Sequence, residues 1–367
     1  MAESVPIREY SERVPSPAYP DVLEVSPKVP KRKRVFISQS DCDFITPVKK
    51  FSGDNKRRRW EADDADIDVI CDESVLEIEK PADAVVHPGG SASEEDASDI
   101  DKYLRSLELK EKNRPIWNFI EVIQKNVTAR NRMVLVDWLV EVASEYNLSS
   151  HTLYLAVSCL DRFLSRRSIP KSKLQLLGVA CMSVAAKYEE MSPPNSAEFA
   201  DITDNAFTKR EVSDMEINVL KVLEWQIGVP TTKTFLSRLL LLLSIQIQNN
   251  GSGTQLEFLT DYLAELSLLD YSCIRYPPSM IAASAVFLAR LNLQPDSDPW
   301  CAALGRCSNY SPSDLSDCVN SLHTLQINKK TSISTAIGEK YKQNKFKSVA
   351  MLVPPVICPS KYFDREC

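Results

Sequence analysis

An internal repeat constrains this chain more than any other feature of its sequence. A shift of 103 residues moves four segments with helical patterns onto four others without a gap. The matched segments are 133–136 with 236–239, 153–163 with 256–266, 178–187 with 281–290, and 208–214 with 311–317. The last pair begin with a hydroxyl residue followed three positions later by an acid, which is the pattern of a helix N-terminus. Because this period is too long for a solenoid, we expect two copies of one helical domain.

One segment of each copy is apolar on every side. Nearly all of 174–188 is Leu, Val, Ala, Cys, Met or Gly, and 281–291 has the same character. A helix without a polar face has to be buried on all sides. We therefore predict an all-α fold in which each domain wraps around one central helix, rather than an up-and-down bundle of four helices.

The first part of the chain differs from the rest in composition. Lys and Arg outnumber Asp and Glu over residues 1–60, whereas residues 61–101 are strongly acidic, with Lys80 as their one basic residue. Neither stretch has a sustained apolar period, so neither can bury enough surface to offset chain entropy. We predict a disordered regulatory tail over residues 1–95. The other expected units are an N-terminal helix with the first domain (96–229), the second domain (230–330), and a C-terminal helix and tail (331–367).

Residue usage argues against several classes of protein. The chain has 9 Gly and contains neither GxGxxG nor GxxxxGK[ST], the phosphate-binding loops. Its 3 His are scattered and its 10 Cys form no CxxC pair, so we expect neither a metal site nor a cofactor. The longest apolar run, 235–247, is too short to span a bilayer, and residues 1–12 lack a secretory apolar core. We expect a non-catalytic, intracellular protein that does not bind membranes.

The tail carries two basic clusters and one candidate phosphorylation site. The clusters, typical of nuclear-import signals, are Lys31, Arg32, Lys33 and Arg34, then Lys56, Arg57, Arg58 and Arg59. They favour a nuclear location, compatible with shuttling to the cytoplasm. The acidic stretch that follows argues against binding of nucleic acid, because it competes for the basic groups. Thr46 precedes Pro47, as in sites of proline-directed kinases, so Thr46 is a candidate phosphosite.

The segment 132–142 has two apolar stripes. The first consists of Met133, Val136, Leu139 and Val140, and the second of Val134, Leu135 and Trp138. Either both stripes are buried in the core, or the second stays exposed beside Glu141 as a docking patch for a peptide. The pattern alone leaves both interpretations open.

Four motifs of the helical region resemble the cyclin family. They are RMVLVDWLVEV (132–142), KLQLL (173–177), AKYEE (186–190) and YKQNKFK (341–347). Over roughly residues 96–350 the chain is most similar to A-type cyclins of the plant group. The resemblance implies two tandem five-helix cyclin boxes. It also implies a regulatory subunit, without catalytic residues, that binds and activates a cyclin-dependent serine/threonine kinase as a heterodimer. Such a subunit helps recruit substrates and controls progression from S phase to mitosis.

The resemblance also assigns kinase-binding residues. The family's charged pair matches Lys187 and Glu216. The apolar contacts around the pair match Tyr188, Leu220, Ile100 and Tyr103, the last two on the helix that precedes the first box. The alternative for Lys187 is that it caps its own helix or pairs with Glu189 or Glu190. In the repeat Glu216 falls on Val319, so only the first domain carries both charges.

Further family features map onto this sequence. The groove for Arg-x-Leu peptides of substrates and inhibitors matches Val134, Leu135, Trp138, Glu141, Leu174 and Gln175. Its usual first residue, a Met, is Asn131 here, and an amide at the rim predicts weaker docking of the peptide. An internal, structural ion pair of the family matches Arg132 and Asp161. The Arg-x-x-Leu destruction signal read by the mitotic ubiquitin ligase occurs only in degenerate form, as Arg34 and Ile37.

Two other classes of protein fit this sequence less well. A transcription-initiation factor with tandem cyclin boxes would carry a zinc ribbon and a basic surface for DNA, but Cys42 and Cys71 are the only Cys in residues 1–100. An all-α enzyme would need an acid–base or nucleophile constellation, which three scattered His do not supply.

Overall fold

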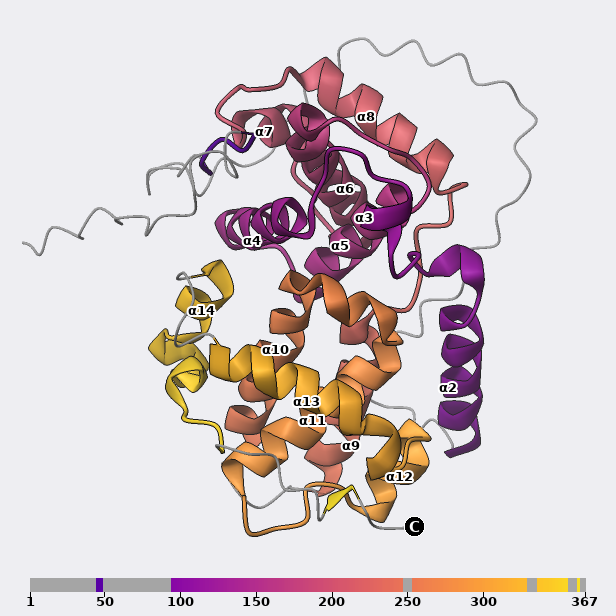
Figure 1. The fold of residues 1–367 in the computed structure, drawn as a ribbon, viewed down its shortest axis with the longest axis vertical. Helices are drawn as coiled ribbons and strands as arrows, with labels where there is room; N and C mark the ends of the chain where they lie inside the picture. Colours follow the sequence, from indigo (N-terminus) through magenta and orange to yellow (C-terminus); the bar gives the residue numbers. More distant parts are fainter. Residues whose placement is uncertain (1–43, 49–93, 247–252, 329–334, 356–361, 364–367) are drawn as a thin grey trace, which may run out of the picture. The chain divides into compact units, whose positions relative to one another are not determined.

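The computed structural model describes residues 44–48, 94–246, 253–328, 335–355 and 362–363. Within these ranges the chain forms α- and 3-10 helices and no strand (Figure 1), which confirms the predicted all-α class. None of the helices so described has the length and apolar character needed to cross a membrane. The same ranges hold no cluster of metal-ligating side chains. The basic clusters at 31–34 and 56–59, together with Ile37, lie outside the described residues.

Five α-helices of the described chain form the first domain. They are α4 (Ala129–Glu145), α5 (Ser150–Leu164), α6 (Leu174–Glu189), α7 (Ser196–Asp201) and α8 (Lys209–Val222). Every residue from 174 to 186 of α6 is buried, because α5 and α8 pack against α6 while α4 and α7 complete its surroundings. The prediction of a central helix in this domain is confirmed.

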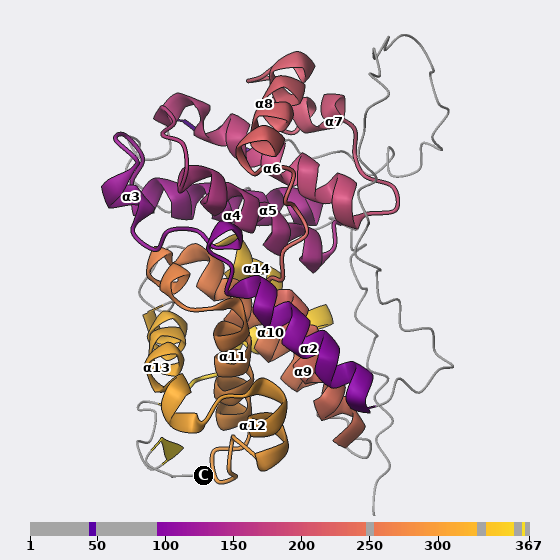
Figure 2. The same cartoon turned by 90° about the vertical axis from the view of Figure 1, so that its right-hand side faces the viewer.

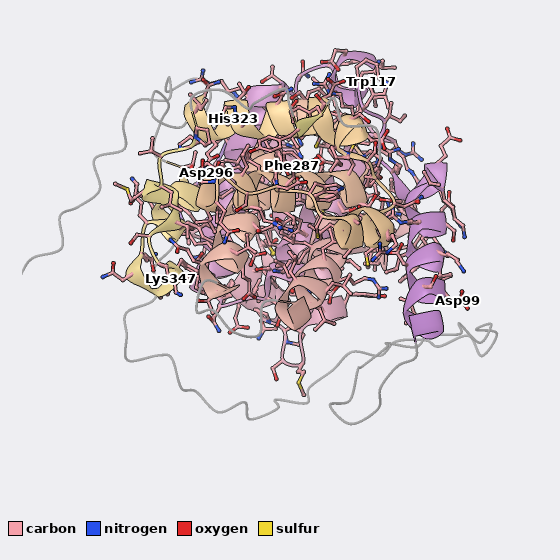
Figure 3. The ribbon with its side chains drawn as sticks, turned by 90° about the horizontal axis from the view of Figure 1, so that it is seen from below. Asp99, Trp117, Phe287, Asp296, His323 and Lys347 are labelled. Atoms are coloured by element: carbon pink, nitrogen blue, oxygen red, sulfur yellow. The ribbon has the colours of Figure 1, made fainter. Side chains whose placement is uncertain are left out.

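The second domain repeats this arrangement. Its helices are α9 (Thr232–Gln246), α10 (Gly253–Leu269), α11 (Pro278–Leu293), α12 (Ala302–Ser308) and α13 (Pro312–Asn328). α11 takes the central place, in contact with α9, α10 and α13, and its Phe287 is fully buried (Figure 3). The helix starts match as well: Glu211 N donates to Thr208 Oγ1 before α8, and Asp314 N donates to Ser311 Oγ before α13. The predicted duplication is confirmed.

The remaining helices connect or flank the two domains. They are α2 (Glu94–Glu108), η2 (Glu111–Asn113), α3 (Phe119–Val122), η3 (Lys171–Lys173), η4 (Tyr271–Arg275), α14 (Ala336–Tyr341), η5 (Asn344–Phe346) and η6 (Val349–Met351). α14 bonds to both domains. Ala336 N donates to Asp137 Oδ1 of α4 at 2.8 Å. Glu265 of α10 accepts from Lys340 Nζ at 2.6 Å and from the Tyr341 hydroxyl at 2.9 Å.

α2 lies along the second domain (Figure 2), and two of its charged side chains bond to that domain. Arg105 donates to the carbonyl of Ser308, and its guanidinium lies 5.4 Å from the ring centroid of Tyr310. Glu108 accepts from Ser279 N at 3.1 Å and from Ser279 Oγ at 2.6 Å. Burial raises the pKa of Glu108, although the bonds from Ser279 oppose this. The helix that precedes the first domain is therefore anchored on the second.

Gly178 allows α6 to approach α4 closely. A Cβ at this position would lie 2.7 Å from Leu135 Cδ1, and Leu135 is completely buried. We expect Gly178→Ala to lower the free energy of unfolding by up to about 2 kcal/mol, because overpacking costs more than the roughly 1 kcal/mol gained in helix propensity. Urea denaturation measures this change.

Gly305 in α12 is the matched control, since a Cβ there would meet its nearest neighbours at 3.7 and 3.8 Å, which is ordinary contact. Gly305→Ala should leave the free energy of unfolding unchanged or raise it by up to about 1 kcal/mol. Equal stability of the two variants would show that the contact between α4 and α6 does not require Gly178.

Candidate functional site

A single ion pair links the end of α6 to the middle of α8. Lys187 Nζ lies 2.7 Å from Glu216 Oε2. The Lys187 side chain is 46% exposed, whereas that of Glu216 is 9% exposed. Lys187 lies in the last turn of α6. Its ammonium group donates a hydrogen bond to Glu216. The two charges that the resemblance paired are thus brought together in space.

The carboxylate of Glu216 is only half satisfied. Its Oε1 atom is buried and has no hydrogen-bond partner in the part of the chain that the structure describes. Buried carboxylate oxygens are normally bonded, so an unpaired one calls for an explanation. An N–H group of another molecule would supply the missing donor. The Lys187 ammonium group has three N–H donors, and its side chain is about half exposed.

Exposed apolar side chains accompany this pair. Tyr188 is 49% exposed, Ile217 47% and Trp225 62%, while Leu220 is half-buried. Trp225 follows α8 in the left-handed region, at φ 59°, and its N–H donates to Leu220 O at 2.9 Å. Large exposed apolar groups beside a charged pair are typical of a protein-binding surface. We define Lys187, Tyr188, Glu216, Ile217, Leu220 and Trp225 as the paired-charge surface.

The sequence did not single out Ile217 and Trp225. Ile217 is one of several apolar residues of an amphipathic helix. Which of them is exposed depends on the face with which α8 packs against α6, and the sequence alone does not show that face. The sequence gives a weak indication for Trp225. It lies in the segment after a helix, where a large aromatic side chain does not need to fill a core.

The second domain does not reproduce the pair. Arg290, the equivalent of Lys187, donates to Asp298 O at 3.4 Å and to Cys301 Sγ at 3.7 Å, so it is bonded to a loop of its own domain. Val319, the equivalent of Glu216, is completely buried. The duplicated fold therefore carries one surface of this kind among its described residues.

Ile100 and Tyr103 lie on α2 and not beside the pair. Tyr103 is 53% exposed and Ile100 is half-buried. Their helix is held on the second domain through Arg105 and Glu108. No hydrogen bond or ion pair of the described chain joins α2 to Lys187 or Glu216. Any partner that touches both groups has to bridge α2 and the first domain.

The residues assigned to a peptide groove lie in the middle of α4 and at the start of α6, two helices that pack against each other. Val134 is 9% exposed, Leu135 0% and Trp138 4%, and on α6 Leu174 is 0% and Gln175 1% exposed. Glu141 is half-buried. The second stripe of α4 is therefore buried in the structure as it stands, in which Gln175 of the same group is bonded to Thr46 of the tail. The indole Nε1 of Trp138 is buried without a hydrogen-bond partner in the described ranges. We call these six residues the α4–α6 patch.

Asn131 does not lie at an exposed rim of the patch, which corrects the interpretation from the sequence. It is 3% exposed, and its Oδ1 accepts from Thr128 N at 3.1 Å and from Thr128 Oγ1 at 3.0 Å. Asn131 N donates in turn to Thr128 Oγ1, which completes a capping box at the start of α4. The amide is thus turned toward its own helix end, where it serves local structure.

Arg132 and Asp161 form a buried ion pair with two hydrogen bonds. Nε to Oδ1 and Nη2 to Oδ2 are both 2.6 Å, and Nη1 donates to Leu268 O of the second domain at 2.8 Å. Burial alone would lower the pKa of Arg132, but the charge and hydrogen bonds of Asp161 outweigh it and the pKa is raised. This pair joins α4, α5 and α10 and lies away from solvent, as a structural pair does.

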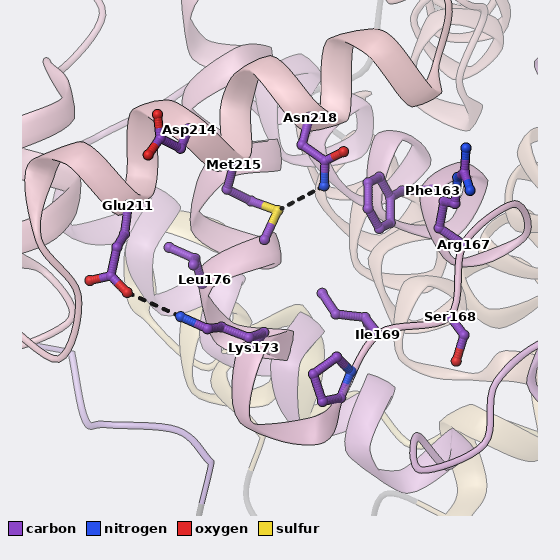
Figure 4. A pocket seen from close by; sticks show the side chains of 11 residues that line it. Phe163, Arg167, Ser168, Ile169, Lys173, Leu176, Glu211, Asp214, Met215 and Asn218 are labelled. Atoms are coloured by element: carbon purple, nitrogen blue, oxygen red, sulfur yellow. Dashed lines mark hydrogen bonds and ion pairs between the residues drawn. The ribbon is translucent and has the colours of Figure 1, made fainter.

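A pocket opens between α5, η3, α6 and α8 (Figure 4). Phe163, Ile169, Leu176 and Met215 supply its apolar lining, and the Lys173–Glu211 ion pair, at 3.0 Å, closes one side. Hydrogen bonds from Thr208 and Lys173 lower the pKa of Glu211 to about 2. No His or Cys lines the pocket, so its lining offers none of the usual nucleophile–base pairs.

Comparison with known proteins gives consistent matches. Residues 99–228 match the family model for the cyclin N-terminal domain, and residues 230–355 the model for the cyclin C-terminal domain. Cyclin-A3-1 of Oryza sativa subsp. japonica is 53% identical over 268 residues, 73% of this chain and 71% of the relative. The G2/mitotic-specific cyclin C13-1 of Daucus carota is 47% identical, over 73% of this chain and 77% of its own. The X-ray structure of a viral cyclin from herpesvirus saimiri has a TM-score of 0.52 at 23% identity, covers 62% of this chain and 94% of its own, and shows the fold alone.

Proposed function

This chain belongs to the cyclin family, and from that premise we propose that it is the non-catalytic regulatory subunit of a cyclin-dependent serine/threonine kinase. The relatives that it matches are plant A-type and G2/mitotic-specific cyclins by name. The lining of the pocket between α5 and α8 holds no His or Cys, which fits an activator better than an enzyme.

The paired-charge surface carries this proposal. It combines a carboxylate oxygen that has no donor among the described residues, a half-exposed ammonium group beside it, and exposed aromatic side chains on α6 and just after α8. Such a surface suits a helix or helix end whose backbone N–H groups reach Glu216 Oε1 while apolar side chains cover Tyr188 and Trp225. Because Glu216 is already buried, a new hydrogen bond to it is stronger than one exposed to water.

The proposed mechanism is conformational. In a kinase the αC helix carries the Glu that pairs with the Lys of strand β3, and that pair positions the phosphates of ATP. When the paired-charge surface packs against αC, it holds this helix in its inward position and helps to order the activation loop. The free energy of the interface thereby shifts the kinase toward its active state.

Several finer features are part of the same proposal. The α4–α6 patch recruits substrates and inhibitors that carry Arg-x-Leu, with apolar groups for the Leu and Glu141 for the Arg. The basic clusters of the tail direct the protein to the nucleus, and the A-type relatives favour action between S phase and mitosis. Degradation through the mitotic ubiquitin ligase would use the degenerate signal at Arg34 and Ile37.

A kinase assay with the full-length chain tests the proposal. We expect a monomeric cyclin-dependent kinase, phosphorylated on its activation loop, to phosphorylate a peptide on the order of 100-fold faster when the chain is added, because the misplaced Lys–Glu pair is corrected. Kinase alone gives the baseline.

The same chain is also titrated against a fluorescent DNA duplex. Binding to the duplex, with neither binding nor stimulation across a panel of cyclin-dependent kinases, would instead support a tandem-box transcription factor.

A further inference from the structure

A short segment of the tail is bound to the first domain. Thr46, far from α6 along the chain, is paired through its backbone with the Gln175 side chain: Thr46 N donates to Gln175 Oε1 at 3.1 Å, and Gln175 Nε2 donates to Thr46 O at 3.2 Å. Gln175 itself is 1% exposed. An amide that bonds both main-chain groups of one residue recognises an extended peptide much as a neighbouring strand does.

Apolar contacts accompany these hydrogen bonds. Phe44, Ile45 and Val48 are partly buried and pack against the hydrophobic core of the domain. The ammonium group of Lys171 lies 5.3 Å from the ring centroid of Phe44. The segment 44–48 thus combines backbone bonds with apolar anchors, which is the way peptides bind in grooves (Figure 1, the indigo piece beside α7).

The hydroxyl group of Thr46 is fully engaged. It donates to the carbonyl oxygen of Thr203, just after α7, at 2.6 Å, and it accepts from Gln175 Nε2 at 3.0 Å. Asp201 and Asp204 flank Thr203 in the sequence. A hydroxyl group that donates to the carbonyl of Thr203 therefore fits at this place, whereas a negatively charged phosphate does not.

We propose that residues 44–48 are a built-in occupant of the α4–α6 patch, and that phosphorylation of Thr46 by a proline-directed kinase releases them. The proposal rests on the proposed function only in taking that patch as the docking site for peptides. Gln175 belongs to the patch and is bonded to the tail, so an incoming peptide that uses the same amide has to displace residues 44–48.

The chemical step is transfer of a phosphoryl group from ATP. The kinase forms a bond between Thr46 Oγ1 and the γ-phosphorus of ATP, the bond from that phosphorus to the bridging oxygen breaks, ADP leaves, and the hydroxyl proton goes to the base of the kinase. Because the bound hydroxyl is bonded on both sides, the kinase acts on the released tail. The product lacks the donor to Thr203 and carries about two negative charges, so it cannot return to the same place.

The tether strengthens the unmodified contact. Residues 49–93 connect the segment to α2, so rebinding is intramolecular and does not depend on the concentration of the protein. A segment of modest intrinsic affinity is then bound most of the time. The apparent affinity of a competing peptide falls in proportion to the fraction of molecules in which the patch is free. Phosphorylation of one residue removes this competition without a change in the patch itself.

Binding of a peptide in trans tests the proposal. The probe is a fluorescein-labelled peptide of residues 40–52 of this chain, titrated with full-length protein and followed by anisotropy. We expect at least about tenfold tighter binding to a Phe44→Ala, Ile45→Ala chain than to the wild-type chain, because the variant tail no longer competes. Thr46→Ser should behave as wild type, since it keeps the donor, whereas Thr46→Glu should behave as the double variant.

A second arm isolates the phosphate. Full-length chain phosphorylated on Thr46 should bind the probe as tightly as the double variant does, and a probe phosphorylated on Thr46 should not bind any of the chains. Ser38→Glu, an acidic substitution elsewhere in the tail, is the control and should leave the wild-type affinity unchanged. Equal affinity of the wild-type and double-variant chains, no binding to either, or equal affinity of the two probes would overturn the proposal. The readout contains no kinase activity, so its failure is distinct from failure of the proposed function.

Discussion

Glu216→Ala is expected to weaken binding of the kinase by about 30-fold or more and to abolish its stimulation at concentrations at which the wild-type chain saturates. Truncation of one partner in a hydrogen-bonded charge pair that becomes buried at an interface costs about 2–5 kcal/mol. Here the loss has two parts: the acceptor Oε1 that awaits a donor, and the orientation of Lys187, whose ammonium lies 2.7 Å from Oε2. Surface plasmon resonance with an immobilised kinase measures the affinity.

The fold of the free chain should tolerate this change. Lys187 is 46% exposed, and pairs of which one member is in water contribute about 1 kcal/mol or less to stability. A normal thermal unfolding curve for Glu216→Ala would therefore assign the lost binding to the surface rather than to misfolding.

The repeat offers a matched control. Arg290→Ala removes the cation at the equivalent helix end of the second domain, where the guanidinium is bonded to Asp298 and Cys301 of its own domain. We expect this variant to bind and stimulate the kinase as the wild-type chain does. Equal loss of binding in Glu216→Ala and Arg290→Ala, or no loss in either, would show that the kinase does not contact the paired-charge surface.

The central helices were predictable because burial there depends on composition alone. A run such as 174–186 leaves no polar face, and the structure buries each of these residues. The helix starts at Thr208 and Ser311 were predictable for a similar reason, since a cap depends on residues three apart. Local and periodic signals thus fixed the duplicated all-α fold.

Features that depend on contacts between distant residues were not predictable in this way. The pattern 133–140 allows either a buried or an exposed second stripe, and Gln175 of the patch is bonded to Thr46, which lies more than a hundred residues away in the sequence. Asn131 was misplaced because the sequence alone does not show that its amide turns back to Thr128. Arg105 gave no signal at all, since its partners Ser308 and Tyr310 lie in the other domain.

The pair of Arg132 and Asp161 leads to the largest expected effect on stability. The two side chains are 2% and 7% exposed, and their bonds connect α4, α5 and the carbonyl of Leu268 at the end of α10. A buried charge that loses its partner is not compensated by water. Arg132→Ala leaves the carboxylate of Asp161 and the carbonyl of Leu268 without their donor, and it also opens a cavity in the packing between the domains.

We expect Arg132→Ala to lower the free energy of unfolding by about 3–5 kcal/mol, measured by guanidinium denaturation with circular dichroism. Lys102→Ala is the control, because the Lys102–Asp99 pair is 73% and 77% exposed and should contribute less than about 1 kcal/mol. The double variant Arg132→Met, Asp161→Leu removes both charges and fills the space, so it should be more stable than Arg132→Ala alone. If the double variant is as unstable as the single one, packing rather than the unpaired charge of Asp161 causes the loss. If Arg132→Ala costs no more than Lys102→Ala, the pair does not hold the two domains together.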